Sequence, residues 1–224
     1  MPEDDVHRCE VDMSLYTPSH FTMSDRVAIA RLIHDYPFAT LVTPAMPEPF
    51  VSHLPLLFVP DCEPHGTLLG HMARANPHWE HATTVASVAI FHGPHAYVSP
   101  SWYAEPAKAV PTWNYAAVHV HGTLDTVEDP VETRQILDAL VQRFEGARDA
   151  PWQFAMPQRQ RDALVGAIVA FRLRVRALEA KFKLSQNRPP GDQVRVADAL
   201  DAEGYADATA VAQWMRRYAG GAGE

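Results

Sequence analysis

Apolar and polar residues alternate with a period of two along several stretches of this chain, which predicts β-strands with one buried face. The clearest case is 167–178, where apolar side chains would face one way and three arginines the other (Val169, Phe171, Leu173, Val175; Arg172, Arg174, Arg176). A second alternating run, Val118-His119-Val120-His121-Gly122, lies within a predicted strand at 113–127. Further strands are predicted at 38–43, 50–59 (with Pro55 indicating an edge or bulge), 67–72, 85–92 and 96–99, the last two separated by a turn at Gly93-Pro94.

Helical spacing of apolar residues appears between these strands. Ser24 and Asp25 are suited to cap a helix that ends near Asp35. A short helix is predicted at 76–82, a longer one at 130–144 that opens with a proline, and another short one at 158–165. One or two helices are predicted over 192–218.

Six or seven short strands at hairpin-like spacing, without regular alternation with helices, favour a mainly β fold with α additions over a doubly wound parallel sheet. We expect an antiparallel barrel flanked by helices. The expected organisation is a flexible acidic tail at 1–13, a barrel domain at 14–190 and a C-terminal helical extension at 191–224.

Composition supports a globular protein, with 47% hydrophobic and 21% charged residues. The net charge of −8 opposes nucleic-acid binding unless a local basic patch exists. Cys9 and Cys62 fall in the tail and in a loop, so we expect no disulfide and a reducing, cytoplasmic location. No apolar run is long enough to span a membrane, and the acidic N-terminus does not resemble a secretory signal.

The stretch 70–79 carries the strongest chemical signal. It ends one predicted strand and opens a helix, a place where unpaired backbone N–H groups gather. Arg74 and Asn76 would bind a phosphate there, with His71 donating to the phosphate or flanking a ring. Helix capping and a solvated surface are the alternative interpretation of the same residues.

Two loops could present a flat ligand with aromatic surface and hydrogen-bond groups. Trp113, Asn114 and Tyr115 could stack on or line a planar ring, although aromatic residues in such loops are more often core. Ser99, Ser101 and Trp102 follow a proline-rich turn, where turn chemistry is the equal alternative.

A third stretch, 181–187, adds cations and polar groups. Alternation places Lys181 and Lys183 on one face, with Ser185 and Gln186 following. Cations there would stabilise negative charge on a reduced ring. The alternative is a solvated basic edge that blocks strand aggregation.

Other chemistries find less support. His119 and His121 share a strand face, but we find no cysteine or carboxylate at a recognisable ligand spacing and predict no metal site. The arginine stripe of the strand at 167–178 is expected to be solvated or ion-paired. The chain has no nucleophile elbow, Walker loop, paired catalytic carboxylates or dinucleotide fingerprint.

Five stretches in order, at 16–21, 70–77, 93–103, 110–115 and 181–187, resemble the PaiB-type family, described as FMN-binding negative transcriptional regulators. That family belongs to the split-barrel flavoproteins related to pyridoxamine phosphate oxidase. The resemblance covers roughly 15–187. It implies a six-stranded, Greek-key split barrel and a homodimer with FMN in a cleft between the subunits.

The resemblance also implies positions for the cofactor. The segment 71–76, which includes Met72, would hold the FMN phosphate with Arg74 as its cation, and the strand at 53–56, with His53 and Leu54, would lie along the flavin ring. The leading functional interpretation is therefore an FMN-binding negative transcriptional regulator.

Two other functions remain open at this point. One is an FMN-dependent oxidoreductase that passes electrons from a nicotinamide to a small acceptor. The other is a ligand-binding protein without turnover. We do not expect direct DNA binding, because the terminal helices show no short-turn pair with a basic recognition face.

Overall fold

The computed structural model describes residues 14–60, 65–153 and 155–218. The predicted tail at 1–13 and both cysteines lie outside these residues. The strands are β1 (Phe38–Thr43), β2 (Phe50–Pro55), β3 (Leu57–Val59), β4 (Thr67–Ala73), β5 (Ser87–Val98), β6 (Thr112–Val127) and β7 (Ile168–Lys183). The α-helices are α1 (Arg26–Asp35), α2 (His78–Ala82), α3 (Pro130–Glu145), α4 (Gln158–Gly166), α5 (Pro190–Glu203) and α6 (Ala206–Tyr218), with short 3-10 helices at Ser19–Phe21, Pro100–Trp102 and Pro106–Lys108.

All seven strands belong to one antiparallel sheet with the order β2-β1-β5-β6-β7-β4-β3. The mainly β fold with α additions is confirmed, but the sheet has seven strands rather than six. The seventh arises because the predicted strand at 50–59 divides at Leu56, whose N–H donates to the carbonyl of Pro37 (2.9 Å). The two edge strands β2 and β3 thus follow each other directly in the chain, and no ladder joins them among the residues described.

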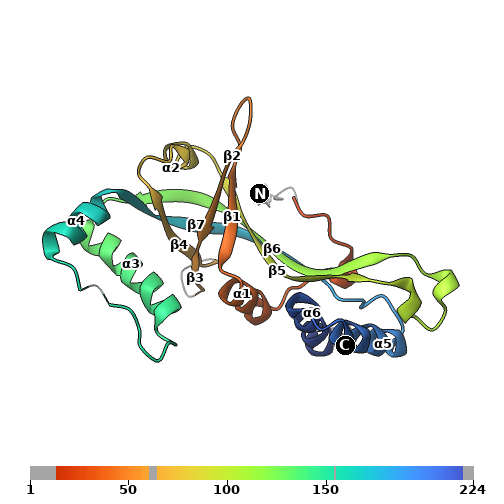
Figure 1. The fold of residues 1–224 in the computed structure, drawn as a ribbon. Helices are drawn as coiled ribbons and strands as arrows, with labels where there is room; N and C mark the ends of the chain where they lie inside the picture. Colours follow the sequence, from red (N-terminus) through yellow and green to blue (C-terminus); the bar gives the residue numbers. More distant parts are fainter. Residues whose placement is uncertain (1–13, 61–64, 154, 219–224) are drawn as a thin grey trace, which may run out of the picture.

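The core lies inside the curl of the sheet. Fully buried side chains from β1, β4, β5, β6 and β7 meet there (among them Leu41, Leu68, Phe91, Val118, Phe171 and Leu173). α1 and α2 lie on opposite sides of these strands (Figure 1). α1 begins as predicted, since the carboxylate of Asp25 accepts the N–H of Val27 (2.8 Å).

The remaining helices pack at the two ends of the sheet, α3 and α4 at one end and α5 and α6 at the other (Figure 1). α3 packs Ile136 and Leu140 against Val127 and Ala170 in a small separate cluster. α5 and α6 lie beneath the long β5–β6 hairpin and add Val196, Leu200, Val211 and Trp214, among others, to the main core. The predicted C-terminal extension therefore shares its core with the barrel.

One predicted detail was wrong. No turn occurs at Gly93-Pro94; β5 continues through these residues as a bulge between His92 and His95. A proline is tolerated at a bulge because its missing N–H leaves no gap in a regular ladder.

The two C-terminal helices are joined by a short turn, because Gly204 adopts a left-handed conformation (φ 74°) and ends α5.

The N-terminal segment pairs with the part of β7 that β4 does not reach. β4 pairs with β7 only as far as Arg174. Beyond it the N–H of Met23 donates to the carbonyl of Ala180 (3.0 Å), and Thr22 forms a bridge with Lys181. The chain from Ser14 onward is thereby held beside the second half of β7. No helix in the described ranges has the length and apolar character to cross a membrane.

Candidate functional site

The sheet has an outer face, which is the face whose side chains point away from the main core. Several of the predicted site residues lie on it. The ladders align His53, Thr40, Ile90, His119 and Glu179 in one row across β2, β1, β5, β6 and β7. His53 is exposed and its Nδ1 lies 3.1 Å from the hydroxyl of Thr40. Large apolar side chains at positions of the same alternation are exposed as well (Phe38 66%, Val51 52%, Tyr97 41% and Trp113 52%). A face of this kind is suited to a ligand or a protein partner.

Arg74 follows β4 and is exposed, but it is not free. Its Nε and Nη2 donate to the carbonyls of Gly166 and Ile168 (2.9 and 2.8 Å), where α4 passes into β7. It borders a cavity of about 340 Å³ that is also lined by Trp79 and Thr133. The guanidinium therefore already fastens β4 to the start of β7.

Asn76 belongs to a chain of buried polar groups. Its amide donates to the hydroxyl of Ser52 (3.0 Å), and its carbonyl accepts the N–H of His78 (3.0 Å). The imidazole of His78 lies between the hydroxyls of Ser52 (2.8 Å) and Thr43 (2.7 Å), and Thr43 contacts Ser87 (2.6 Å). This chain fixes the 74–78 segment against β1, β2 and β5, and burial lowers the pKa of His78, with His81 adding to the effect.

The expected anion site at the start of α2 is less open than the sequence indicated. The N–H groups of Arg74, Asn76 and His78 are bonded to Ala167 O, Ala73 O and Asn76 Oδ1. Pro77 occupies the N-cap position. These three donors would have to exchange partners to reach a phosphate.

His71 is the predicted residue with an unsatisfied group. Its Nδ1 is buried without a hydrogen-bond partner, which the described chain shows for only one other side-chain atom, Arg161 Nε. Burial lowers the pKa of His71, so the neutral imidazole is favoured. A buried polar atom without a partner is costly and suits a bound ligand that supplies one. Its neighbour Met72 points into the main core.

Three consecutive residues at the start of β6, which the sequence analysis placed together in one site, point to opposite faces of the sheet. Trp113 and Tyr115 share the outer face, where Trp113 contacts the rings of His95 and Tyr97. Asn114 points to the opposite side because side chains alternate along β6. It is 1% exposed and its amide donates to Ser185 Oγ (2.9 Å) and to Met215 Sδ of α6 (3.4 Å). That placement gives Asn114 a packing role and does not support contact with a ring on the outer face.

Lys181 and Lys183 lie on the outer face, within β7 rather than after it. Lys181 Nζ donates to the carbonyl of Tyr16 (2.8 Å) and sits over the rings of Tyr16 and Tyr115. Lys183 donates to the hydroxyl of Thr112 and the carbonyl of Trp113. Burial lowers the pKa of Lys183, and the charges of Lys181 and Arg188 act in the same direction.

The other predicted polar residues stabilise turns. Ser185 has a positive φ of 68° and is buried against Asn114. Gln186 bridges Leu184 N and Phe182 O (2.7 and 2.5 Å). Ser99 caps the 3-10 helix at Pro100–Trp102 through Ser101, and Trp102 packs on the main core, as does Leu54 of β2.

The predicted residues therefore form two groups. One surrounds β2 and the end of β4 (His53, Leu54, His71, Met72, Arg74 and Asn76), and the other surrounds the β5–β6 hairpin and the end of β7 (Ser99, Ser101, Trp102, Trp113, Asn114, Tyr115, Lys181, Lys183, Ser185 and Gln186). Within the part of the chain described, no hydrogen bond or ring contact links one group to the other. A single chain does not gather all of them around one ligand.

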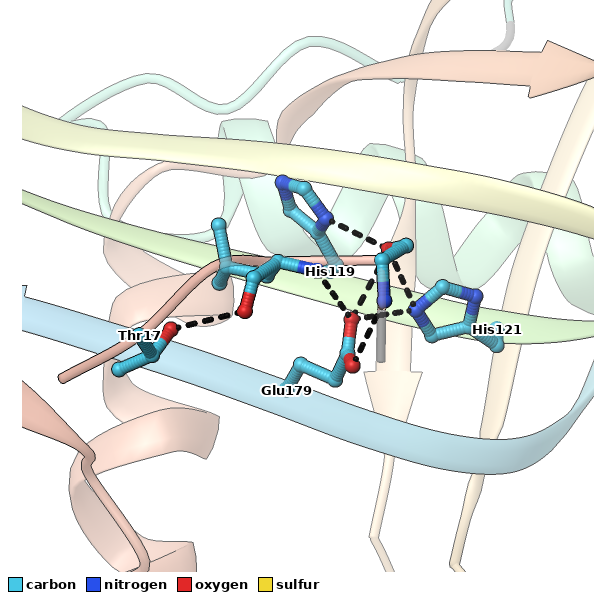
Figure 2. A network of polar contacts seen from close by, with 6 residues as sticks. Thr17, His119, His121 and Glu179 are labelled. Atoms are coloured by element: carbon cyan, nitrogen blue, oxygen red, sulfur yellow. Dashed lines mark hydrogen bonds and ion pairs between the residues drawn. The ribbon is translucent and has the colours of Figure 1, made fainter. Parts of the chain in front are cut away.

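The structure corrects the expectation that no carboxylate accompanies the paired histidines. Glu179 of β7 lies directly opposite His119 in the ladder, and its Oε2 is 2.9 Å from His121 Nε2 (Figure 2). Burial lowers the pKa of His119, while the Glu179 carboxylate opposes that shift. Sequence spacing could not reveal this carboxylate, because it depends on the register between two strands that are distant in the chain. Extending the alternation of β7 past 178 was the available signal.

Comparison with known proteins agrees with the fold. A family described as "Putative FMN-binding domain" matches residues 15–177. The chain is 35% identical over 204 residues to "Protease synthase and sporulation protein PAI 2" of Bacillus subtilis (strain 168), covering 90% of this chain and 96% of that protein.

Among solved structures, the FAD and heme binding protein from Mycobacterium smegmatis has a TM-score of 0.58 at 18% identity, covering 77% of this chain and 78% of that one. The flavocytochrome Anf3 from Azotobacter vinelandii has a TM-score of 0.59 at 14% identity, covering 72% and 69%. These likenesses concern the fold alone, and they agree with a split-barrel architecture. The match over 15–177 and the PAI 2 relative decide the family: the chain belongs to the PaiB-type family of FMN-binding domains, with FMN as its cofactor.

Proposed function

We propose that the protein is a cytoplasmic, homodimeric regulator of the PaiB type, in which each FMN is held between two subunits. The observation that carries this proposal is the division of the candidate flavin residues into two groups at separate parts of one sheet. A two-fold arrangement would bring the His71–Arg74 group of one chain to the hairpin group of its partner, as closed symmetric dimers do.

The outer face supports the same proposal. Association would remove apolar surface from water, which is favourable, at four exposed side chains of this face (Phe38, Val51, Tyr97 and Trp113). The net charge of −8 opposes self-association, and on this face the half-buried Lys183 offsets it locally, whereas Lys181 is buried beneath Tyr16.

The residues present fit an FMN group. FMN supplies electron transfer when bound. His71 Nδ1 has an unmet hydrogen bond, Arg74 is an exposed cation beside it in sequence, and Trp113 offers an exposed ring. Lys181 and Lys183 would stabilise negative charge on a reduced ring if they face it.

Regulation in this proposal is indirect. The helix pair α5–α6 has the short turn of a DNA-binding motif, but its core-facing residues are committed to the barrel. Arg216 in the last turn of α6 is paired with Asp198 and Asp201 (3.0 and 2.7 Å). A flavin state or a small metabolite is therefore the more suitable signal than direct contact with DNA.

Transcript profiling of cells tests the regulatory role. We expect deletion of the gene to change transcript levels, wild-type protein to restore them, and Arg74→Ala to fail as a flavin-defective variant. Arg31→Ala, which alters an exposed pair on α1, is the matched control and should restore them. Unchanged transcripts on deletion, or full restoration by a flavin-free variant, would contradict the proposal. Steady nicotinamide consumption by the FMN-loaded protein would favour the oxidoreductase instead.

A further inference from the structure

His119, His121 and Glu179 form a compact cluster on the outer face of β6 and β7 (Figure 2). One ligand-type atom from each residue lies within 4.8 Å of the other two. The cluster is set by the backbone: the histidines are two residues apart on one strand, and Glu179 is the ladder partner of His119. Its three side chains therefore converge without any long or flexible element.

Glu179 is in an unusual electrostatic position. It is 5% exposed, and its one ion pair with the described residues is with His121. The nearest cation along the same strand face, Lys181, is directed to Tyr16 instead. Burying a carboxylate is costly unless hydrogen bonds and a positive charge compensate it. Glu179 accepts hydrogen bonds from Ser14 and Leu15, but no Lys or Arg of the described residues pairs with it. The cluster would be better compensated by a bound cation.

The hydroxyl of Ser14 marks the place that such a cation would take. Ser14 Oγ lies 3.3 Å from His119 Nδ1, 3.3 Å from His121 Nε2 and 2.9 Å from Glu179 Oε2. In the metal-free form the hydroxyl donates to Glu179 Oε2, and an imidazole N–H can donate to the hydroxyl oxygen or to the carboxylate. The deprotonated nitrogen atoms of both imidazoles and the carboxylate oxygen surround this one point, which is the arrangement that a metal ion requires.

The ligand set indicates the kind of metal. Two imidazoles and one carboxylate bind zinc in sites that keep a further position open, and the same set binds other divalent transition metals. Zinc–ligand distances are about 2.0–2.2 Å for these atoms, so each ligand would have to move inward by roughly 1 Å from its distance to Ser14 Oγ. Side-chain rotation and a shift of the Ser14 segment supply such a movement without changing the ladder.

We propose that His119, His121 and Glu179 bind a divalent transition-metal ion such as Zn²⁺ at the position of the Ser14 hydroxyl, in competition with the N-terminal segment. In the metal-free form, three groups at the start of that segment donate to Glu179: Ser14 Oγ (2.9 Å), and the N–H groups of Ser14 and Leu15 (3.1 and 3.2 Å). Metal binding to Glu179 competes with these hydrogen bonds. The site is separate from the residues that the FMN proposal uses and does not depend on it.

Calorimetric titration of the purified full-length chain with Zn²⁺ tests the site, with metal content after dialysis measured independently. We expect one Zn²⁺ per chain and a loss of affinity of about tenfold or more in His121→Ala and Glu179→Gln. Glu179→Gln is nearly isosteric, so its unchanged melting temperature without metal would show that folding is intact. The control is His34→Ala, an exposed histidine on α1, which should bind as wild type does.

Ser14→Ala tests the competition. Removing the hydroxyl leaves all three ligands in place, so we expect Zn²⁺ affinity to stay equal or increase. Absence of Zn²⁺ binding by the wild-type chain would overturn the proposal. So would binding that survives in both His121→Ala and Glu179→Gln, because the ion would then occupy other histidines. A loss of affinity in Ser14→Ala would overturn the competition with the segment.

Discussion

Arg74 has a guanidinium that can serve both the fold and a phosphate. Two of its nitrogen atoms donate to carbonyls at the end of α4 and the start of β7, which fixes the side chain at the junction of these elements. We predict that Arg74→Ala weakens FMN binding by about 1.5–3 kcal/mol, the range for a hydrogen bond to a charged group. Flavin fluorescence titration measures this change, with Arg31→Ala as the exposed control. Equal affinities in wild type and Arg74→Ala would remove Arg74 from the site, whatever the melting temperature.

His78 makes stability depend on pH. Its pKa is lowered in the folded chain, whereas the unfolded chain has a histidine pKa near the usual value of about 6.5. Below that value the unfolded state binds more protons, so stability falls as the pH decreases toward the folded pKa, by at most about 1.4 kcal/mol per pH unit. Stability contributed by neutral His78 is fully present only above the unfolded pKa.

Denaturant unfolding between neutral and mildly acidic pH tests this dependence. His71 and His119 have lowered pKa values too, so the comparison is wild type against His78→Gln. We expect the variant to be less stable at neutral pH, because Ser52 and Thr43 lose well-placed partners, but to lose less stability on acidification. Parallel pH profiles for the two proteins would contradict a neutral, buried His78.

For single residues, the sequence predicted which residue types belong to a candidate site better than it predicted which way their side chains point. It selected Trp113, Lys181 and His71, which the structure places on the outer face or leaves partly unsatisfied. It could not show that Asn114 points inward or that Asn76 is bonded to Ser52. Those outcomes depend on strand register and on partners far along the chain.

Among the glycines of the described residues, Gly122 of β6 leaves the least room for a side chain. The register shifts there between His121 and Gly122, and a Cβ on Gly122 would lie 2.2 Å from the carbonyl oxygen of Arg174. We predict that Gly122→Ala destabilises the protein by about 1–3 kcal/mol or more, as overpacking does. Gly166→Ala is the control, because nothing lies within 4 Å of its added Cβ. Thermal unfolding compares the two variants. Equal melting temperatures would contradict the prediction, because they would show that β6 and β7 accommodate the added Cβ without loss of stability.

Elements with long periodic patterns were predicted well. The strand at 113–127, the helix at 130–144 and the arginine face of β7 all agree with the structure, since local alternation and capping decide them. Arg172 and Arg174 are ion-paired with Glu132 and Asp125, as the solvated or paired interpretation expected. The division at Leu56 and the continuation through Gly93-Pro94 were missed, because the surrounding sheet rather than the local sequence determines where a strand bends.

At the level of the whole molecule, the outer face of the sheet is the surface that we propose as the dimer interface. Its exposed apolar residues and the separation of the two candidate groups both suit a two-fold dimer. We predict that sedimentation equilibrium gives a dimer and that Trp113→Glu, which buries a charge in the proposed interface, shifts it toward monomer. Val131→Glu, on the solvent side of α3, is the control and should leave the mass unchanged. A monomeric wild type that still retains FMN would contradict the shared site.

Titration of the purified chain with FMN, followed by flavin fluorescence and by sedimentation of the loaded protein, tests whether two chains share the flavin. We expect saturable binding of one FMN per chain, with all bound flavin sedimenting with a dimer. A chain that takes up no flavin at any accessible concentration, or one FMN per chain on a stable monomer, would contradict it.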